Sequence, residues 1–229
     1  MEYQNEIAKG TFLRRPNRFL AEVACGEECM QVHVKNTGRC RELLQEGAVV
    51  YLEKSNHPNR KTQYSLIAVC KGERLVNLDA QAPNAVAAEA LAAGRITELG
   101  AVCRIRQEVR FGSSRFDLYY EAEGRKGFVE VKGVTLEEAG IAMFPDAPTK
   151  RGAKHLAELV SARQQGYEAA VLFLVQMQGV HAFCPNAKRD AVFAQALQDA
   201  AQAGVRILAY DCRVWERGLQ MNHAVPVRL

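Results

Sequence analysis

The chain has 229 residues, of which 48% are hydrophobic and 24% are charged. This balance is typical of a folded globular protein and excludes a disordered or fibrous chain. The formal net charge of +4 is only mildly basic, so attraction to nucleic acid has to come from local clusters of arginine and lysine.

The seven cysteines form no C-x-x-C pair and have no histidines at zinc-finger spacing. We therefore interpret them as small apolar residues in a reducing compartment. The chain begins MEYQNEIAKG, without a basic and then apolar leader, and the apolar run at residues 169–175 is too short to cross a bilayer. These features predict a cytoplasmic protein with no membrane contact.

Up to about Asp79 the sequence predicts short strands separated by turns. The predicted strands are residues 11–15, 18–25, 29–35, 48–55, 63–70 and 73–79. A short helix is predicted over residues 39–44, after a turn at Asn36, Thr37 and Gly38. So many short strands in one segment favour a small β-barrel of the OB-fold kind, which often binds nucleic acid strands. We place this barrel at residues 1–82.

Two basic clusters in this half could follow a phosphate backbone without base specificity. They are Arg14, Arg15 and Arg18, and Arg60 with Lys61. The alternative is a solvated charged surface. The aromatic residues that could stack on bases, with core packing as the alternative for most of them, are Phe12, Phe19, Tyr51 and Tyr64.

From residue 83 onwards helices and strands alternate, which predicts an α/β domain with a mixed central sheet over residues 83–229. The predicted helices are residues 83–94, 149–166 and 189–204. The predicted single strands are residues 101–111, 168–176, 179–184 and 205–212.

A β-hairpin is predicted at residues 115–133, RFDLYYEAEGRKGFVEVKG. A two-residue loop at Glu123 and Gly124 would set Asp117 opposite Glu130. A three-residue loop would break this register and separate the two acids. The position of the turn therefore decides whether the acids meet.

Alternation along the two strands sorts their side chains into two faces. The apolar face is predicted to hold Phe116, Leu118, Tyr120, Val129 and Val131. The charged face would hold Asp117, Glu130 and Lys132, so two carboxylates and an ammonium would share one small volume.

This charged face has the chemistry of a divalent-metal site. Mg²⁺ or Mn²⁺ would be bound by the carboxylates of Asp117 and Glu130 and by the backbone carbonyl of Val131, because such cations prefer oxygen ligands. Lys132 could orient an attacking water or stabilise charge on a phosphate. Metal-assisted phosphodiester hydrolysis follows as a hypothesis, and a surface ladder of ion pairs is the alternative.

The same residues resemble known families. An aspartate on one strand, E-V-K on the next and a preceding helix with a glutamate are similar to the PD-(D/E)XK nuclease superfamily. More closely, the chain resembles the sugar fermentation stimulation protein family, SfsA, and several separate motifs fall in the family's order over most of the chain. These motifs are NTGR, NRKTQYSL, SRFD, FVEVKGVTL and MFPDAPTKRGAKHLAEL.

The resemblance implies an OB-fold domain joined to a PD-(D/E)XK nuclease-like domain, DNA binding, and a link to the regulation of sugar, particularly maltose, metabolism. It implies that Asp117 and Glu130 bind metal and that Lys132 is catalytic. Glu89 matches the helix glutamate of the superfamily, with an exposed solubilising role as the alternative. Phe116 stands where the superfamily's name has proline, a position that varies among its members.

The predicted helix at residues 149–166 carries Arg151, Lys154 and His155, which could contact DNA phosphates. His155 could also be a general base, because histidine titrates near neutrality. Nucleases of this kind can act with the metal and lysine alone, so a phosphate contact or a structural role is favoured for His155.

The sequence thus predicts a DNA-binding protein with a metal-dependent nuclease-type active site. The alternatives are a DNA-binding transcriptional regulator that keeps the nuclease fold without catalysis, and an adaptor whose charges are incidental. The acid, acid and lysine set favours the enzyme, because carboxylates facing a polyanion repel it unless a cation intervenes.

Overall fold

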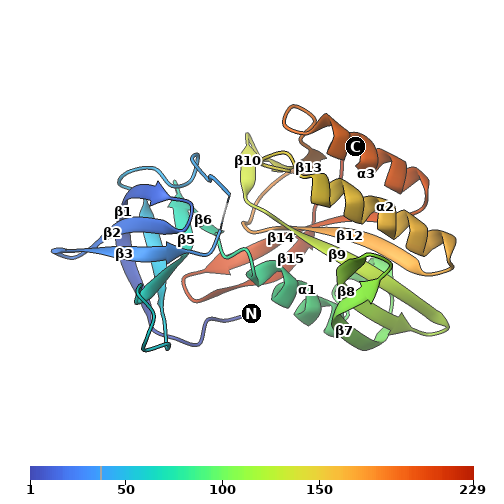
Figure 1. Ribbon diagram of the computed structural model, residues 1–229, viewed down its shortest axis with the longest axis horizontal. Coiled ribbons are helices and arrows are strands. Elements are labelled where there is room, and N and C mark those ends of the chain that lie inside the picture. Colours follow the sequence, from blue (N-terminus) through green and yellow to red (C-terminus); the bar gives the residue numbers. More distant parts are fainter. Residues whose placement is uncertain (37) are drawn as a thin grey trace.

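The computed structural model describes residues 1–36 and 38–229, so Thr37 of the predicted turn lies outside the described residues. An all-β body formed by the first third of the chain and an α/β body formed by the rest lie side by side along the longest axis (Figure 1). This is the order of domains that the sequence predicts.

The all-β body is a closed barrel. Its strands are β1 (Ile7–Asn17), β2 (Leu20–Cys25), β3 (Glu28–Val34), β4 (Val49–Lys54), β5 (Tyr64–Lys71) and β6 (Arg74–Asn77). They follow the order β3-β2-β1-β4-β5-β6, and β3 also pairs in parallel with β5, which closes the first five strands. Inward residues such as Val23, Val32 and Leu52 are fully buried, as period-2 alternation requires. The predicted OB-like barrel is confirmed.

The helix predicted over residues 39–44 is wrong. The N–H groups of Leu43 and Leu44 both bond to the carbonyl of Cys40, at 3.1 and 2.8 Å, and form a single turn. Cys40 has a φ of 45°, which lies outside the right-handed helical region. Both leucines are buried, so packing against the barrel holds this segment instead of helical hydrogen bonds.

The α/β body is built on a mixed six-stranded sheet with the order β15-β14-β12-β9-β8-β7. Its strands are β7 (Val102–Phe111), β8 (Ser114–Ala122), β9 (Arg125–Val134), β12 (Glu168–Val175), β14 (Arg206–Trp215) and β15 (Gly218–Ala224). The central strand β12 is parallel to both β9 and β14, and the outer pairs are antiparallel. Every residue of β12 from Ala169 to Val175 is buried, as expected for a strand covered on both faces.

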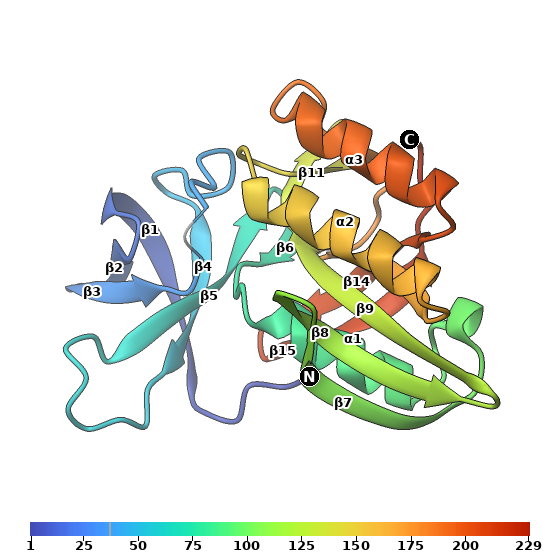
Figure 2. The same cartoon turned by 45° about the vertical axis from the view of Figure 1, so that its right-hand side comes forward.

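Helices cover both faces of this sheet (Figure 2). Helix α1 (Ala82–Ala92) lies on one face, and α2 (Lys150–Gln164) and α3 (Ala191–Gln202) lie on the other. Thr149 caps α2 by accepting the N–H of Gly152 at 3.0 Å, and Asp190 caps α3 by accepting the N–H of Phe193 at 2.9 Å. These caps fix where both helices begin.

Short elements complete the fold. They are the 3₁₀ turn η1 (Thr97–Leu99) and a small sheet of β10 (Leu136–Glu138), β11 (Ile141–Phe144) and β13 (Ala182–Pro185). The sequence does not reveal β10, β11 or β15. The first two have only three and four residues, too few for an alternating pattern to be visible.

Buried polar contacts join the barrel to the α/β body. Glu137 accepts a hydrogen bond from Lys71 at 2.7 Å and lies 3.1 Å from the guanidinium of Arg74. Gln176 donates to the side chain of Asn77 at 3.0 Å. Glu137, Gln176 and Asn77 are all buried, so separating the two bodies would leave polar groups unpaired.

No helix among the described residues is both long and apolar enough to cross a membrane. All seven cysteines are free, and Cys40 and Cys212 are buried as small apolar residues. Burial raises the pKa of the Cys40 thiol to about 12, so this thiol is unreactive in the folded protein.

Candidate functional site

The β8–β9 hairpin has the predicted register. Ala122 pairs with Arg125 across a two-residue turn, and the pairing continues to Leu118 and Val129. Gly124 has a φ of +65°, which a tight turn of this kind requires. Asp117 and Glu130 are therefore the next residues along the two strands.

The β8–β9 pairing ends at Leu118 and Val129, so Asp117 is the first residue of β8 beyond it. In this register the N–H of Val131 would bond to the backbone of Phe116, but it donates instead to Oδ2 of Asp117 at 2.7 Å. The N–H and C=O of one strand residue point to the same side. The carbonyl of Val131 thus faces the same opening as the Asp117 carboxylate.

The predicted division into two faces is wrong at Phe116. This ring packs against Phe128, with centroids 5.2 Å apart, in the cluster beneath α2, whereas Leu118 belongs to the cluster beneath α1. Alternation fails because the facing strand is irregular: Glu108 lies opposite Asp117 and has a φ of 57°. Side chains on either side of Asp117 therefore turn to opposite faces of the sheet.

Glu130 is buried beneath α2 and is held through one oxygen. Its Oε1 accepts from Nζ of Lys132 at 2.5 Å and contacts Nδ1 of His155. Its Oε2 is also buried and has no hydrogen-bond partner among the described residues. A buried carboxylate oxygen without a partner is costly, and a cation or a water molecule bound there would remove this cost.

Asp117 approaches from the other side of the sheet. Its Oδ1 accepts from the side-chain amide of Asn84, on the first turn of α1, at 2.8 Å. Burial raises the pKa of Asp117 above its ordinary value, and the nearby charge of Glu130 raises it further. The two acids share one region from opposite faces, and not from a single face as the sequence predicts.

The available oxygens fit a divalent cation of the magnesium type. Asp117, Glu130 Oε2 and the carbonyl of Val131 are hard oxygen donors, and Mg²⁺ commonly takes one or two carboxylates and keeps several waters. Within residues 1–36 and 38–229, no three His, Cys, Asp or Glu side chains gather closely enough to bind a metal by themselves. The set therefore suits a cation that also binds water or substrate oxygens.

His155 lines a cleft together with Arg151 and Lys154, but its ring is held within the protein. It is buried, at 5% exposure, and its two ring nitrogens are engaged: Nδ1 by Glu130, and Nε2 by Nε of Arg151 at 3.3 Å. Because Arg151 can only donate, the remaining proton of a neutral His155 is on Nδ1, facing Glu130. His155 thus holds Glu130 through Oε1, which agrees with the structural role that the sequence leaves open, and its DNA contact stays a prediction.

Glu89 is not brought to the acids. Its carboxylate lies 2.5 Å from the N-terminal ammonium of Met1 and is 58% exposed. The helix residue that does reach Asp117 is Asn84, five positions earlier, which on an α-helix is roughly 140° around the axis. The alternative of an exposed, non-catalytic glutamate agrees with this placement.

No pattern in the sequence points to Asn84, but one nearby residue explains its position. A Cβ on Gly133, which directly follows Lys132, would lie 2.7 Å from Cγ of Pro83 and 2.5 Å from Oε1 of Gln176. Glycine therefore allows α1 to begin close to β9, which sets Asn84 beside Asp117.

A basic cleft of about 560 Å³ opens beside His155, between the β7–β8 turn and α2. Arg110 and Arg115 line it from the strands, and Arg151 and Lys154 line it from the helix. Among the described residues that line the cleft, none is acidic, although Arg115 pairs with Glu108 at 2.6 Å and Lys154 lies 3.8 Å from Glu158. The sequence predicts Arg151 and Lys154 as DNA contacts, but it does not place Arg110 and Arg115 beside them, because only the hairpin turn brings these two opposite the helix.

Comparisons with known proteins agree over the whole chain. Residues 13–78 match the model of the SfsA N-terminal OB domain, and residues 81–218 match that of the sugar fermentation stimulation protein RE domain. The chain belongs to the sugar fermentation stimulation protein family. The resemblance seen in the sequence motifs is confirmed.

Relatives in this family span nearly the full chain. The sugar fermentation stimulation protein homolog of Alkaliphilus oremlandii is 52% identical over 99% of this chain and 98% of its own. That of Clostridium botulinum (strain Loch Maree) is 48% identical over 100% of both chains. A solved structure, Pyrococcus furiosus SfsA in complex with Ca²⁺, is 29% identical and superposes with a TM-score of 0.90 over 100% of this chain and 98% of its own.

In this member of the sugar fermentation stimulation protein family, the barrel arginines have different roles. Arg14 is exposed and forms two bonds to Glu22, at 2.7 and 3.0 Å. Arg18 is exposed, with its guanidinium 4.7 Å from the centre of the Phe19 ring. Lys61 is exposed and Arg60 is half-buried beside a polar hollow on the barrel. A ligand can therefore reach three of these side chains at the protein surface, those of Arg14, Arg18 and Lys61.

Arg15 is held by the protein itself, and its predicted DNA contact stays a prediction. Its guanidinium donates to four backbone carbonyls at 2.6 to 2.8 Å, those of Arg18, Asn36, Gly38 and Arg39. The side chain therefore ties the end of β1 to the loop after β3. Its Nε is buried and has no partner among the described residues, while the two terminal nitrogens are taken up by carbonyls.

We expect Arg15→Ala to lower the free energy of unfolding by about 2–4 kcal/mol, because it leaves several partly buried carbonyls unpaired. Denaturant unfolding measures this loss. Arg14→Ala is the matched control, since Arg14 is exposed and its partner is the side chain of Glu22, and it should change stability little. Equal stability of the two variants would contradict the structural role of Arg15.

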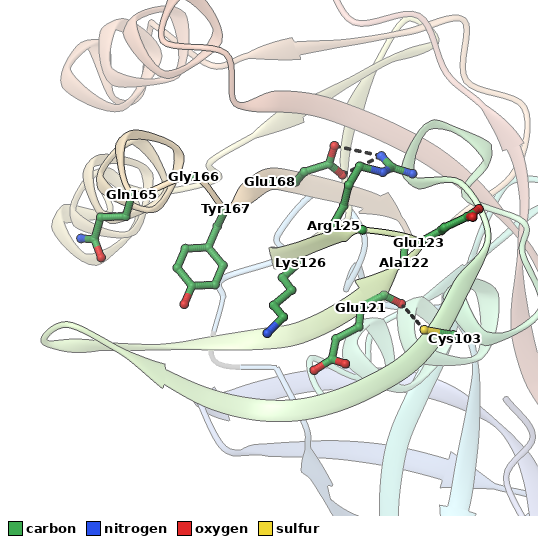
Figure 3. A pocket seen from close by; sticks show the side chains of 11 residues that line it. Cys103, Glu121, Ala122, Glu123, Arg125, Lys126, Gln165, Gly166, Tyr167 and Glu168 are labelled. Atoms are coloured by element: carbon green, nitrogen blue, oxygen red, sulfur yellow. Dashed lines mark hydrogen bonds and ion pairs between the residues drawn. The ribbon is translucent and has the colours of Figure 1, made fainter.

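A larger hollow, of about 670 Å³, lies at the turn end of the same hairpin (Figure 3). Glu168, one of its lining residues, accepts from Arg125, as Figure 3 shows, and from Arg206, each at 2.9 Å. Burial opposes ionisation of Glu168, but hydrogen bonds from Arg206, Tyr120 and Arg125 hold its pKa at about 2. We assign this hollow a structural role.

Proposed function

We propose that the chain binds DNA and hydrolyses phosphodiester bonds with a divalent cation, Mg²⁺ or Mn²⁺, held by Asp117, Glu130 and the carbonyl of Val131. The observation that carries this proposal is the buried Oε2 of Glu130, which lacks a partner among the described residues although Oε1 of the same carboxylate has two. The relative from Pyrococcus furiosus is described with Ca²⁺, which supports a divalent-cation site in this family.

Each neighbouring side chain has a defined role in this proposal. A cation bound there would polarise the phosphodiester and lower the pKa of a bound water. Lys132, 17% exposed and fixed by Glu130, supplies positive charge to the developing charge on the phosphate. Asn84 and His155 hold the two carboxylates in position, as supporting residues commonly do around metal ligands.

The basic cleft supports a nucleic acid as the substrate. Arg110, Arg115, Arg151 and Lys154 would neutralise phosphates on either side of the scissile bond. These contacts carry no base specificity, so we propose binding without strong sequence preference. The family's link to sugar and maltose regulation would then act through DNA.

The deciding experiment is cleavage of end-labelled single-stranded and duplex DNA with Mg²⁺ or Mn²⁺. Wild type should cut, and Lys132→Ala and Asp117→Asn should be slower by roughly 100-fold or more. Chelation by EDTA should stop all cleavage. A protein that binds DNA with strong salt dependence but never cuts it would support the non-catalytic regulator instead.

A further inference from the structure

The tip of the β1–β2 hairpin carries an exposed aromatic side chain. Phe19 is 46% exposed, whereas Phe12 and Tyr51, two other aromatic residues of the barrel, are 3% and 8% exposed. Core packing explains the buried pair but not Phe19. An exposed ring that serves no core is a candidate for contact with a ligand.

This tip is rigid. Oδ1 of Asn17 accepts the N–H groups of Phe19 at 2.8 Å and Leu20 at 3.1 Å, and the carbonyl of Phe19 accepts the N–H of Val34 at 2.8 Å. Arg15 holds the carbonyl of Arg18 from behind at 2.8 Å. The backbone that presents the ring is thus bonded on both sides, and little backbone entropy remains to be lost on binding.

The surroundings of the ring are cationic. The guanidinium of Arg18 lies 4.7 Å from the ring centre, and Arg39 is exposed on the loop whose carbonyl Arg15 binds, whereas the nearby Arg14 is paired with Glu22. An aromatic face beside arginines suits a nucleobase with its phosphate, because the base stacks and the phosphate meets positive charge. A duplex hides its base faces, so the ligand that fits is a single strand.

Arg15 links the tip to a loop that lines a cavity beside β9. Arg15 also binds the carbonyls of Asn36 and Gly38, and these two residues line a cavity of about 210 Å³ together with Gly133. Gly133 directly follows Lys132 on β9. The loop bound by Arg15 therefore lies across a cavity from the strand that carries Lys132.

We propose that Phe19 stacks on an unpaired base of single-stranded DNA while Arg18 contacts the neighbouring phosphate. This deepens the proposed function, on which it rests, by naming a single strand as the preferred substrate and the barrel tip as the place that selects it.

The test is binding of fluorescein-labelled oligothymidylate, of matching duplex and of an abasic strand, by fluorescence anisotropy in EDTA over a range of salt. Phe19→Leu keeps an apolar side chain but lacks an aromatic face. It should bind oligothymidylate roughly 5- to 100-fold more weakly, and bind duplex and abasic strands like wild type. Its salt slope should not change, whereas Arg18→Ala should reduce the slope by about 0.7.

Two further variants show whether a loss of binding in Phe19→Leu comes from the missing aromatic ring or from a general effect of substitution. Phe19→Trp should retain single-strand affinity, and its fluorescence should be quenched on binding. Val192→Ala removes a side chain that is 72% exposed on α3, and it should change nothing. Circular dichroism establishes that all variants are folded.

The proposal is overturned if Phe19→Leu binds oligothymidylate within about twofold of wild type, or if it is weakened by the same factor on duplex and abasic strands. Binding in EDTA needs no cleavage, so this failure is distinct from failure of the nuclease. If the wild type cuts DNA and Phe19→Leu binds oligothymidylate as the wild type does, the proposed active site stands and only the stacking role of Phe19 is rejected.

Discussion

Asp117→Asn is expected to stabilise the metal-free protein and, in the same molecule, to remove its stabilisation by divalent cations. Burial and the charge of Glu130 raise the pKa of Asp117, so its ionised form is unfavourable in the folded state. Asparagine can still accept the N–H of Val131, and the amide of Asn84 can turn to accept from the new Nδ2. The variant should therefore unfold at a higher temperature than the wild type in EDTA, by roughly 2–4 °C for each 1 kcal/mol gained.

The pH dependence of this gain follows from the direction of the shift. The ordinary pKa is 3.8, and the folded value is higher. Between the two values the folded state binds more protons than the unfolded state, so the free energy of unfolding falls as pH rises through this window. The penalty then stays constant at higher pH. The variant lacks this penalty, and its advantage in EDTA should grow across the window and then level off.

Added cation should reverse the comparison. At a free concentration of about 100 times Kd, Mg²⁺ or Ca²⁺ should add about 2.7 kcal/mol to the wild type and nothing to the variant. Thermal unfolding with and without cation measures both effects. Glu89→Gln is the control, because Glu89 pairs with the N-terminus and should leave the metal response intact. A full metal response in Asp117→Asn would remove this residue from the ligand set.

The acids could be predicted from sequence because they depend on local rules. The turn formers Glu123 and Gly124 fix the hairpin register, and the register fixes which residue follows the last pair on each strand. The face of Asp117 could not be predicted, because the irregular backbone of Glu108 lies on another strand. Alternation describes a regular strand, and here the functional residue lies where regularity ends.

The surrounding residues depend on contacts between distant segments. Asn84 reaches Asp117 only because α1 begins beside Gly133, and Arg110 faces Lys154 only because the β7–β8 turn folds back toward α2. Arg15 shows a structural role that the sequence does not reveal. A basic cluster in the sequence favours a phosphate contact, but the carbonyls that take up its guanidinium come from a loop more than twenty residues away.

Neutralising the two walls of the basic cleft is expected to weaken DNA binding without affecting the metal site. Arg110 and Lys154 both line the cleft, whereas the acids and Lys132 take their hydrogen bonds from Asn84, His155 and one another. Removing one phosphate-binding charge reduces the salt slope on duplex DNA by about 0.9, so Arg110→Ala with Lys154→Ala should reduce it by about 1.8. Affinity near 0.1 M salt should fall roughly 10- to 100-fold for all sequences alike.

The matched control also removes two positive charges, but from the far end of strands β7 and β9. Arg104 and Lys126 are both exposed, and both align with Glu121, about 20 Å along the strands from the cleft. Arg104→Ala with Lys126→Ala lowers the net charge equally and should leave the slope near that of the wild type. Equal reductions in the two double variants would mean that total charge, and not the cleft, attracts DNA. A slope reduced only by the changes at Arg110 and Lys154, with thermal stabilisation by Mg²⁺ unchanged, would place the phosphate backbone beside Glu130.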